Sequence, residues 1–129
     1  MAMIKLDLQS KIPLYLQMEQ QIIDLILLGV LKENDQLPSV RNLARELGIN
    51  PNTIQKAYQD MESRGIIYSV VGRGNFVASP SAAENLKRRE TMSALEKLLL
   101  DALRAGISAQ ELHQAVDAAF ETRKEDDLQ

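Results

Sequence analysis

The chain contains no cysteine, which excludes both a disulfide framework and a thiolate metal site. His113 is the only histidine, and no acidic cluster with metal-ligand spacing accompanies it. A lone histidine on a terminal helix is more often a surface or interface residue than a ligand, so we assign it no chemistry. We therefore expect no metal and no cofactor. The lack of cysteine also fits a reducing cytoplasm.

Long hydrophobic runs are missing as well. The longest apolar stretch, from Leu25 to Leu31, follows Asp24 and is far shorter than the roughly 18 residues that a membrane span requires. The N-terminal segment carries Lys5 and Asp7 and lacks the uninterrupted apolar region of a signal peptide. These absences predict a soluble cytoplasmic protein with no membrane partner.

The sequence also lacks a catalytic constellation: no nucleophile stands beside a base, and no metal set or dinucleotide fingerprint is present. Gly72-Arg73-Gly74 resembles a phosphate-binding loop only superficially, because no helix N-terminus follows it to hold an anion. A length of 129 residues allows one core or two small subdomains, but no large catalytic domain. We predict that the protein is not an enzyme.

The segment from Leu37 to Tyr58 predicts two short helices joined by a tight turn. Ser39 can cap a first helix whose apolar residues recur at i, i+3, i+4 and i+7, namely Val40, Leu43, Ala44 and Leu47. Gly48 ends that helix, and Asn50 followed by Pro51 supplies the N-cap and the first turn of the next one. This arrangement predicts a helix-turn-helix.

The second predicted helix has two chemically different faces. One face is an apolar stripe made of Ile54, Ala57, Tyr58 and Met61. The opposite face carries side chains that can contact base edges and phosphates, namely Asn52, Gln55, Lys56 and Gln59. The polar face therefore predicts a contact with nucleic acid.

Two flanking segments complete a small domain. Before the motif, the sequence predicts an amphipathic helix from Pro13 to about Leu28, which Gly29 ends and whose buried stripe is Leu14, Met18, Ile22, Leu25 and Ile26. After Gly65, residues 66–71 and 75–78 predict two short strands, joined by a turn at residues 72–74. Two strands with a basic tip form a wing.

The formal net charge of −3 argues against a polyanionic partner, but the charges are unevenly distributed. From Ser39 to Tyr58 the sequence has Arg41, Arg45 and Lys56 against one acidic residue, and the acidic excess returns from Glu111 onward. This pattern indicates a locally basic face on an acidic body, which suits specific DNA binding with weak non-specific binding. Arg45 could equally pair with a carboxylate, near Glu46 or at Asp60.

Ser79-Pro80-Ser81 marks a boundary, after which the pattern is helical to the end. Gly106 separates two amphipathic helices, and Ser108 with Glu111 matches a capping box at the start of the second. A pair of this size cannot bury its own apolar stripe well, and a second copy is the simplest way to cover it. The predicted dimer interface consists of Met92, Leu95, Leu99, Leu103, Leu112, Val116 and Phe120.

Six motifs in register carry a resemblance to a known family. They are Pro13-Leu14-Tyr15, Leu37-Pro38-Ser39-Val40-Arg41, Asn50-Pro51-Asn52-Thr53-Ile54, Ala57-Tyr58, Gly65-Ile66-Ile67 and Gly72-Arg73-Gly74-Asn75-Phe76-Val77. Over roughly residues 12–77 the chain resembles the winged-helix regulators of the GntR family. The 50 or so residues that follow are too few for the larger effector domains of that family, and they look like the YtrA subgroup, whose short C-terminal part is two dimerising helices.

The resemblance implies a role for each matching residue. It places Arg41 on the phosphate backbone, Asn52, Thr53, Gln55 and Lys56 in the major groove, and Gly72 and Arg73 at the minor groove. Many relatives have a cation where this chain has Pro51, so the base contacts rest more on Asn52, Gln55 and Lys56. The full predicted DNA-binding set is Ser39, Arg41, Asn50, Asn52, Thr53, Gln55, Lys56, Gln59, Gly72 and Arg73.

We therefore predict a mainly α fold with a small β wing: a winged helix-turn-helix domain in residues 1–79, then a helical pair for dimerisation in residues 80–129. The predicted function is that of a sequence-specific transcriptional regulator, a repressor that binds an inverted-repeat operator in double-stranded DNA as a homodimer. The alternative is a winged-helix adaptor that binds another protein and not DNA. Steep salt dependence of binding to random duplex DNA separates the two. No effector site can be recognised in the sequence.

Overall fold

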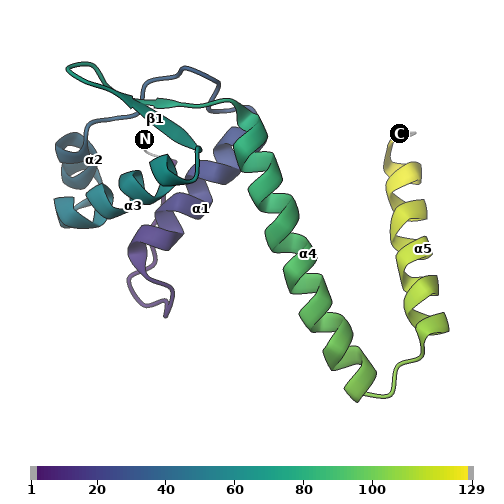
Figure 1. The fold of residues 1–129 in the computed structure, drawn as a ribbon. Coiled ribbons are helices and arrows are strands. Elements are labelled where there is room, and N and C mark those ends of the chain that lie inside the picture. Colours follow the sequence, from purple (N-terminus) through teal and green to yellow (C-terminus); the bar gives the residue numbers. More distant parts are fainter. Residues whose placement is uncertain (1–2, 128–129) are drawn as a thin grey trace. The chain divides into compact units, whose positions relative to one another are not determined.

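The computed structural model describes residues 3–127, which divide into two compact units with the boundary between Arg88 and Arg89. The first unit contains three helices and two strands, followed by the first turns of a fourth helix (Figure 1). The three helices are α1 (Leu14–Leu27), α2 (Val40–Leu47) and α3 (Pro51–Ser63). Pro13 is the N-cap of α1 rather than its first helical residue.

The tight turn between α2 and α3 forms as the sequence predicts. The Ser39 hydroxyl accepts a hydrogen bond from the Asn42 backbone N–H at 3.1 Å, and the Asn50 side chain accepts one from the Asn52 N–H at 2.9 Å. Gly48 lies between the helices in the left-handed region, with φ of 68°. Because an L side chain is strained in that conformation, glycine is the residue that suits this helix end.

The wing consists of β1 (Ile67–Val70) and β2 (Gly74–Val77), which pair antiparallel. Its turn starts one residue earlier than predicted, because Val70 pairs with Gly74 and the Arg73 N–H donates to the Val70 carbonyl. Val71 and Gly72 are thus the central turn residues, and Gly72 has φ of 78°, as the second central position of a type II turn requires. Val71 is wholly exposed at the tip.

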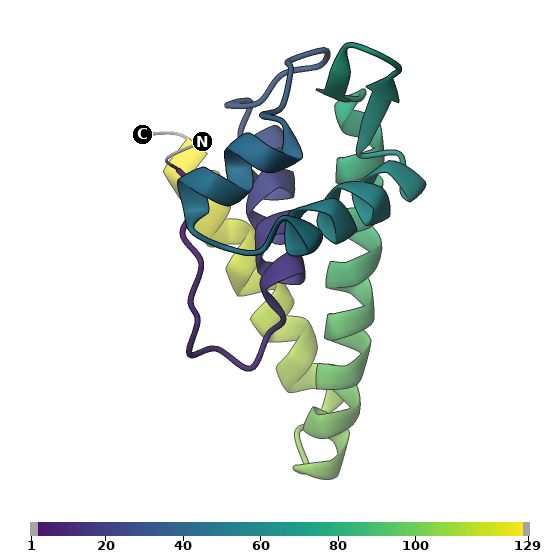
Figure 2. The same cartoon turned by 90° about the vertical axis from the view of Figure 1, so that its left-hand side faces the viewer.

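A segment before α2 runs beside the wing and supports its second strand (Figure 2). Asn34 N–H donates to the Val77 carbonyl at 2.7 Å, and Leu37 N–H donates to the Asn75 carbonyl at 2.8 Å. Residues 34–37 thus bind the wing along the edge of β2.

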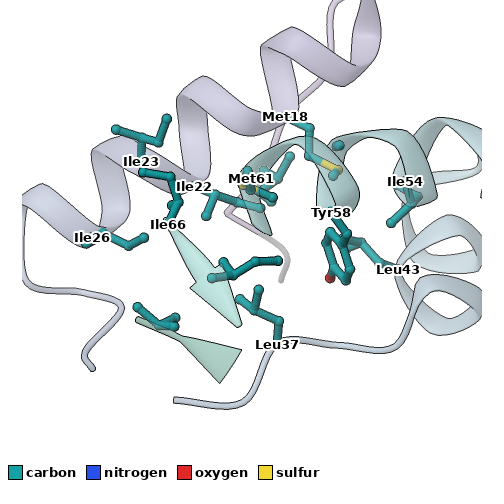
Figure 3. Close-up of a cluster of buried hydrophobic side chains, with 14 of the residues drawn as sticks. Met18, Ile22, Ile23, Ile26, Leu37, Leu43, Ile54, Tyr58, Met61 and Ile66 are labelled. Atoms are coloured by element: carbon teal, nitrogen blue, oxygen red, sulfur yellow. The ribbon is translucent and has the colours of Figure 1, made fainter. Parts of the chain in front are cut away.

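One apolar core joins the three helices and the wing (Figure 3). The predicted stripe of α3 is confirmed, since all four of its residues are buried. On α1 the buried set differs from the predicted one: Ile23 and Glu19 are buried, whereas Leu14 and Leu25 are only half-buried. The fully buried large side chains are Met18, Ile22, Leu43, Ile54, Met61, Ile66, Ile67 and Val77.

Two helices make up the C-terminal part of the chain, α4 (Pro80–Arg104) and α5 (Ala109–Asp127). The start of α4 belongs to the first unit, where Ala83 is buried in the core. The predicted capping box at the start of α5 forms: Ser108 N–H donates to the Glu111 carboxylate at 2.8 Å, and Glu111 N–H donates to the Ser108 hydroxyl at 3.1 Å. Over residues 3–127, no helix combines the length and apolarity needed to cross a membrane.

Candidate nucleic-acid interface

The polar face of α3 is the centre of the candidate interface. Asn52, Gln55, Lys56 and Gln59 are all exposed, whereas Thr53 is half-buried at the edge of this face. The apolar stripe on the opposite side of the helix is buried in the core. The rotation of α3 about its axis is therefore fixed by packing, and its amide-bearing side chains project into solvent.

Tyr58 fixes α3 against the start of α2. Its hydroxyl donates to the Pro38 carbonyl at 2.7 Å, and its ring is buried. Burial raises the pKa of the Tyr58 hydroxyl above its ordinary value, so the group stays neutral and remains a donor. This bond holds the two motif helices in their tight arrangement.

Exposed cations also lie on α2 and on the wing, the two elements that contact α3. Arg41 lies in the first turn of α2, and Arg73 follows Gly72 in the wing turn. Arg45 is also exposed, in the last turn of α2. Asp60, one of the carboxylates considered as its partner, pairs with Arg64 at 3.2 Å. The predicted set of cations and amides is thus distributed over α2, α3 and the wing of a single compact unit.

Two residues to which the sequence assigned no role in the site position parts of this interface. The Gln36 side-chain amide donates to the Arg73 carbonyl at 2.8 Å and so ties the wing turn to the segment before α2. The ring of Tyr15, at the start of α1, lies under the Lys56 ammonium at 4.2 Å. Both contacts join elements far apart in the sequence, and no local pattern reveals them.

A shallow groove lies beside the Tyr15 and Lys56 pair. It has a volume of about 590 Å³ and is lined by Pro13, Leu14, Tyr15, Asn52, Thr53 and Lys56. The groove therefore lies between the first turns of α1 and α3. Within residues 3–127 no three histidine, aspartate or glutamate side chains gather closely enough to hold a metal ion.

The second unit presents apolar rather than polar side chains. Six of the seven residues predicted as dimer contacts are exposed, and Leu112 is half-buried. Leu98, Leu100 and Ile107, which the predicted set omitted, are exposed as well. An apolar groove of about 420 Å³ lies on this unit, lined by Leu95, Leu98, Leu99, Asp101, Ala102, Ala105, Ile107 and Leu112.

Comparison with known proteins places this geometry in a family. The fold and the exposed face of α3 define a winged helix-turn-helix protein. The chain belongs to the GntR family: residues 14–77 match the model described as "Bacterial regulatory proteins, gntR family". The chain is also 40% identical over 114 residues to the HTH-type transcriptional repressor YtrA of Bacillus subtilis, which covers 87% of this chain and 88% of the relative.

Solved structures of transcriptional regulators share this fold. A transcriptional regulator from Oenococcus oeni is 29% identical and covers 89% of this chain and 97% of its own, with a TM-score of 0.79. The AraR(DBD) in complex with operator ORX1 is 31% identical and covers 58% of this chain and 96% of its own, with a TM-score of 0.53. The family and these relatives are transcriptional regulators and not enzymes.

The Gln36 contact predicts how the wing turn is stabilised. Replacing Gln36 with alanine removes a bond worth about 1 kcal/mol, so we expect amide hydrogen exchange at Arg73 to accelerate by about fivefold. Exchange in the buried stripe of α3 should stay unchanged. Gln9→Ala, which removes the same side chain from the exposed N-terminal segment, is the matched control. Equal exchange rates at Arg73 in both variants would show that Gln36 does not hold the turn.

Proposed function

We propose that the protein is a transcriptional repressor that binds operator DNA through α3 and the wing, and that it does so as a homodimer. The observation that carries the proposal is the exposed polar face of α3, which belongs to the same compact unit as exposed cations on α2 and on the wing. The solved complex of AraR(DBD) with its operator supports it, because that domain matches over half of this chain. A protein that regulates bacterial genes in this way acts in the cytoplasm.

In this proposal α3 enters the major groove. Asparagine and glutamine side chains suit that role because their amides can donate to and accept from an adenine edge at the same time. Arg41, at the N-terminal end of α2, lies on the phosphate backbone. The full proposed contact set is Ser39, Arg41, Asn50, Asn52, Thr53, Gln55, Lys56, Gln59, Gly72 and Arg73.

The wing makes a second, less selective contact. Arg73 is an exposed cation in a turn whose neighbours, Gly72 and Gly74, have no side chains, so the backbone can approach a narrow groove closely. We assign this turn to the minor groove, where base recognition is degenerate and positive charge is favoured. The wing then contributes affinity, whereas α3 contributes sequence selection.

The apolar face of the second unit is proposed to bind a second copy of the chain. Its residues are apolar side chains that are exposed or half-buried, and apolar side chains gathered in an exposed patch mark an interaction site. They are Met92, Leu95, Leu99, Leu103, Leu112, Val116 and Phe120. A twofold axis is the usual solution for such a patch, and it would relate two copies of α3. The operator is then an inverted repeat, with half-sites about one helical turn apart or a multiple of it. Residues 80–129 would act as the dimerisation segment of a DNA-binding domain in residues 1–79.

A substitution of Gln55 tests directly whether α3 recognises the DNA sequence. Replacing Gln55 with alanine should weaken binding to a duplex selected from a random pool by about 1–3 kcal/mol, because a bidentate base contact is lost. Binding to an unrelated duplex should change little. Fluorescence anisotropy measures both affinities, with Gln9→Ala as the matched control. Binding that Gln55→Ala leaves intact on both duplexes would show that Gln55 does not contact a base. A wild type whose binding to duplex DNA does not depend on salt would instead favour a protein-binding adaptor.

Substitutions on the apolar face of the second unit test whether operator binding depends on dimerisation. Leu99→Glu and Leu112→Glu place a charge on the apolar face, so we expect both variants to be monomeric in sedimentation equilibrium. Operator affinity should then fall by about 10²-fold or more, because two linked contacts become one. Leu28→Glu, at an exposed leucine after α1, is the matched control and should stay dimeric. A monomeric wild type, or a monomeric variant with full operator affinity, would refute the coupling.

A further inference from the structure

Lys56 is the one cation on the exposed face of α3, and a ring from another helix fixes its position. The ammonium lies 4.2 Å from the centroid of the Tyr15 ring. This distance is within the roughly 6 Å at which a cation is attracted to an aromatic face. Tyr15 is itself half-buried and packs against the core, so the ring is a fixed support.

The position of Lys56 around the helix differs from that of the amides. Successive residues of a helix are about 100° apart around its axis, so Asn52, Gln55 and Gln59 lie within an arc of about 60°. Lys56 lies outside that arc, on the far side of Asn52 from Gln55. The contact with Tyr15 directs the lysine toward α1 and away from the centre of the face.

The position of Lys56 at the flank of the exposed face determines which part of the DNA its ammonium can contact. A helix with its side chains is about 10–12 Å wide, and the major groove is about 12 Å wide, so a recognition helix fills the groove. Side chains at the centre of its exposed face meet base edges, whereas a side chain at its flank meets the phosphodiester strand that borders the groove. The groove of about 590 Å³ beside Lys56 leaves room for such a strand between α1 and α3.

We propose that Tyr15 is a positioning residue for DNA binding, which holds the Lys56 ammonium against the phosphodiester backbone rather than a base edge. The inference rests on the proposed function and refines it. Lys56 then supplies affinity that is independent of sequence and sensitive to salt, and sequence reading is left to Asn52, Gln55 and Gln59. Fixing a flexible lysine before binding also lowers the entropy lost on forming the complex.

A double-mutant cycle on the full chain tests this role. Lys56→Met should weaken binding to a selected duplex and to an unrelated duplex by the same factor, and should reduce the slope of log affinity against log salt by about 0.9. Tyr15→Leu should weaken both by about two- to fivefold. Tyr15→Phe, which keeps the aromatic ring, should bind both duplexes with the affinity of the wild type. In the Lys56→Met background Tyr15→Leu should have no further effect, whereas in the Arg73→Met background its effect should persist.

A measurement without DNA keeps the test separate from that of the proposed function. The ring current of Tyr15 should shift the Lys56 ε-methylene signals in the NMR spectrum of the free protein, in the wild type and in Tyr15→Phe, but not in Tyr15→Leu. Unshifted wild-type signals would overturn the inference. So would a Tyr15→Leu penalty that persists in Lys56→Met, a Tyr15→Phe variant as weak as Tyr15→Leu, or a change of sequence preference in Lys56→Met. A wild type that binds no duplex would contradict the proposed function itself, whatever the NMR result.

Discussion

The burial of Ile54, Ala57, Tyr58 and Met61 fixes the rotation of α3 about its axis, and that rotation determines which side chains the helix presents to solvent. Burying a large apolar side chain stabilises the fold by roughly 1.5–3 kcal/mol, so turning α3 by even one residue would forfeit much of this stabilisation. The exposed amides are therefore a consequence of the core. The wing and α2 depend on the same stripe, because both pack around α3.

Three contacts between segments that are distant in the sequence order the surface of the candidate interface. Tyr58 bonds the start of α2, Gln36 bonds the wing turn, and Tyr15 lies under Lys56. Each contact is worth only about 1 kcal/mol, which is small beside the core. Their effect is to fix the positions of cations and helix ends before any partner arrives, and this reduces the entropy lost on binding.

Helix caps and helix ends were predictable from the sequence, whereas contacts between distant segments were not. The Ser39 cap, the Gly48 turn and the box formed by Ser108 and Glu111 each involve residues within a few positions of one another, so their spacing predicted them correctly. Val71 was assigned to a strand because β-branched residues favour strands, yet the pairing of Val70 with Gly74 places it in the turn. The burial of Glu19 could not be inferred, because a search for apolar periodicity passes over a charged residue. The roles of Gln36 and Tyr15 depend on elements that meet only in the folded chain.

We propose that the exposed face of α3 contacts the bases of DNA, while its buried stripe keeps the fold unchanged. NMR titration of the full chain with a duplex selected by the protein tests this claim directly. We expect the side-chain amide signals of Asn52, Gln55 and Gln59 to shift on binding, whereas the methyl signals of Ile54 and Met61 should not. Shifts confined to other surfaces, with the α3 amides unmoved at saturation, would contradict it.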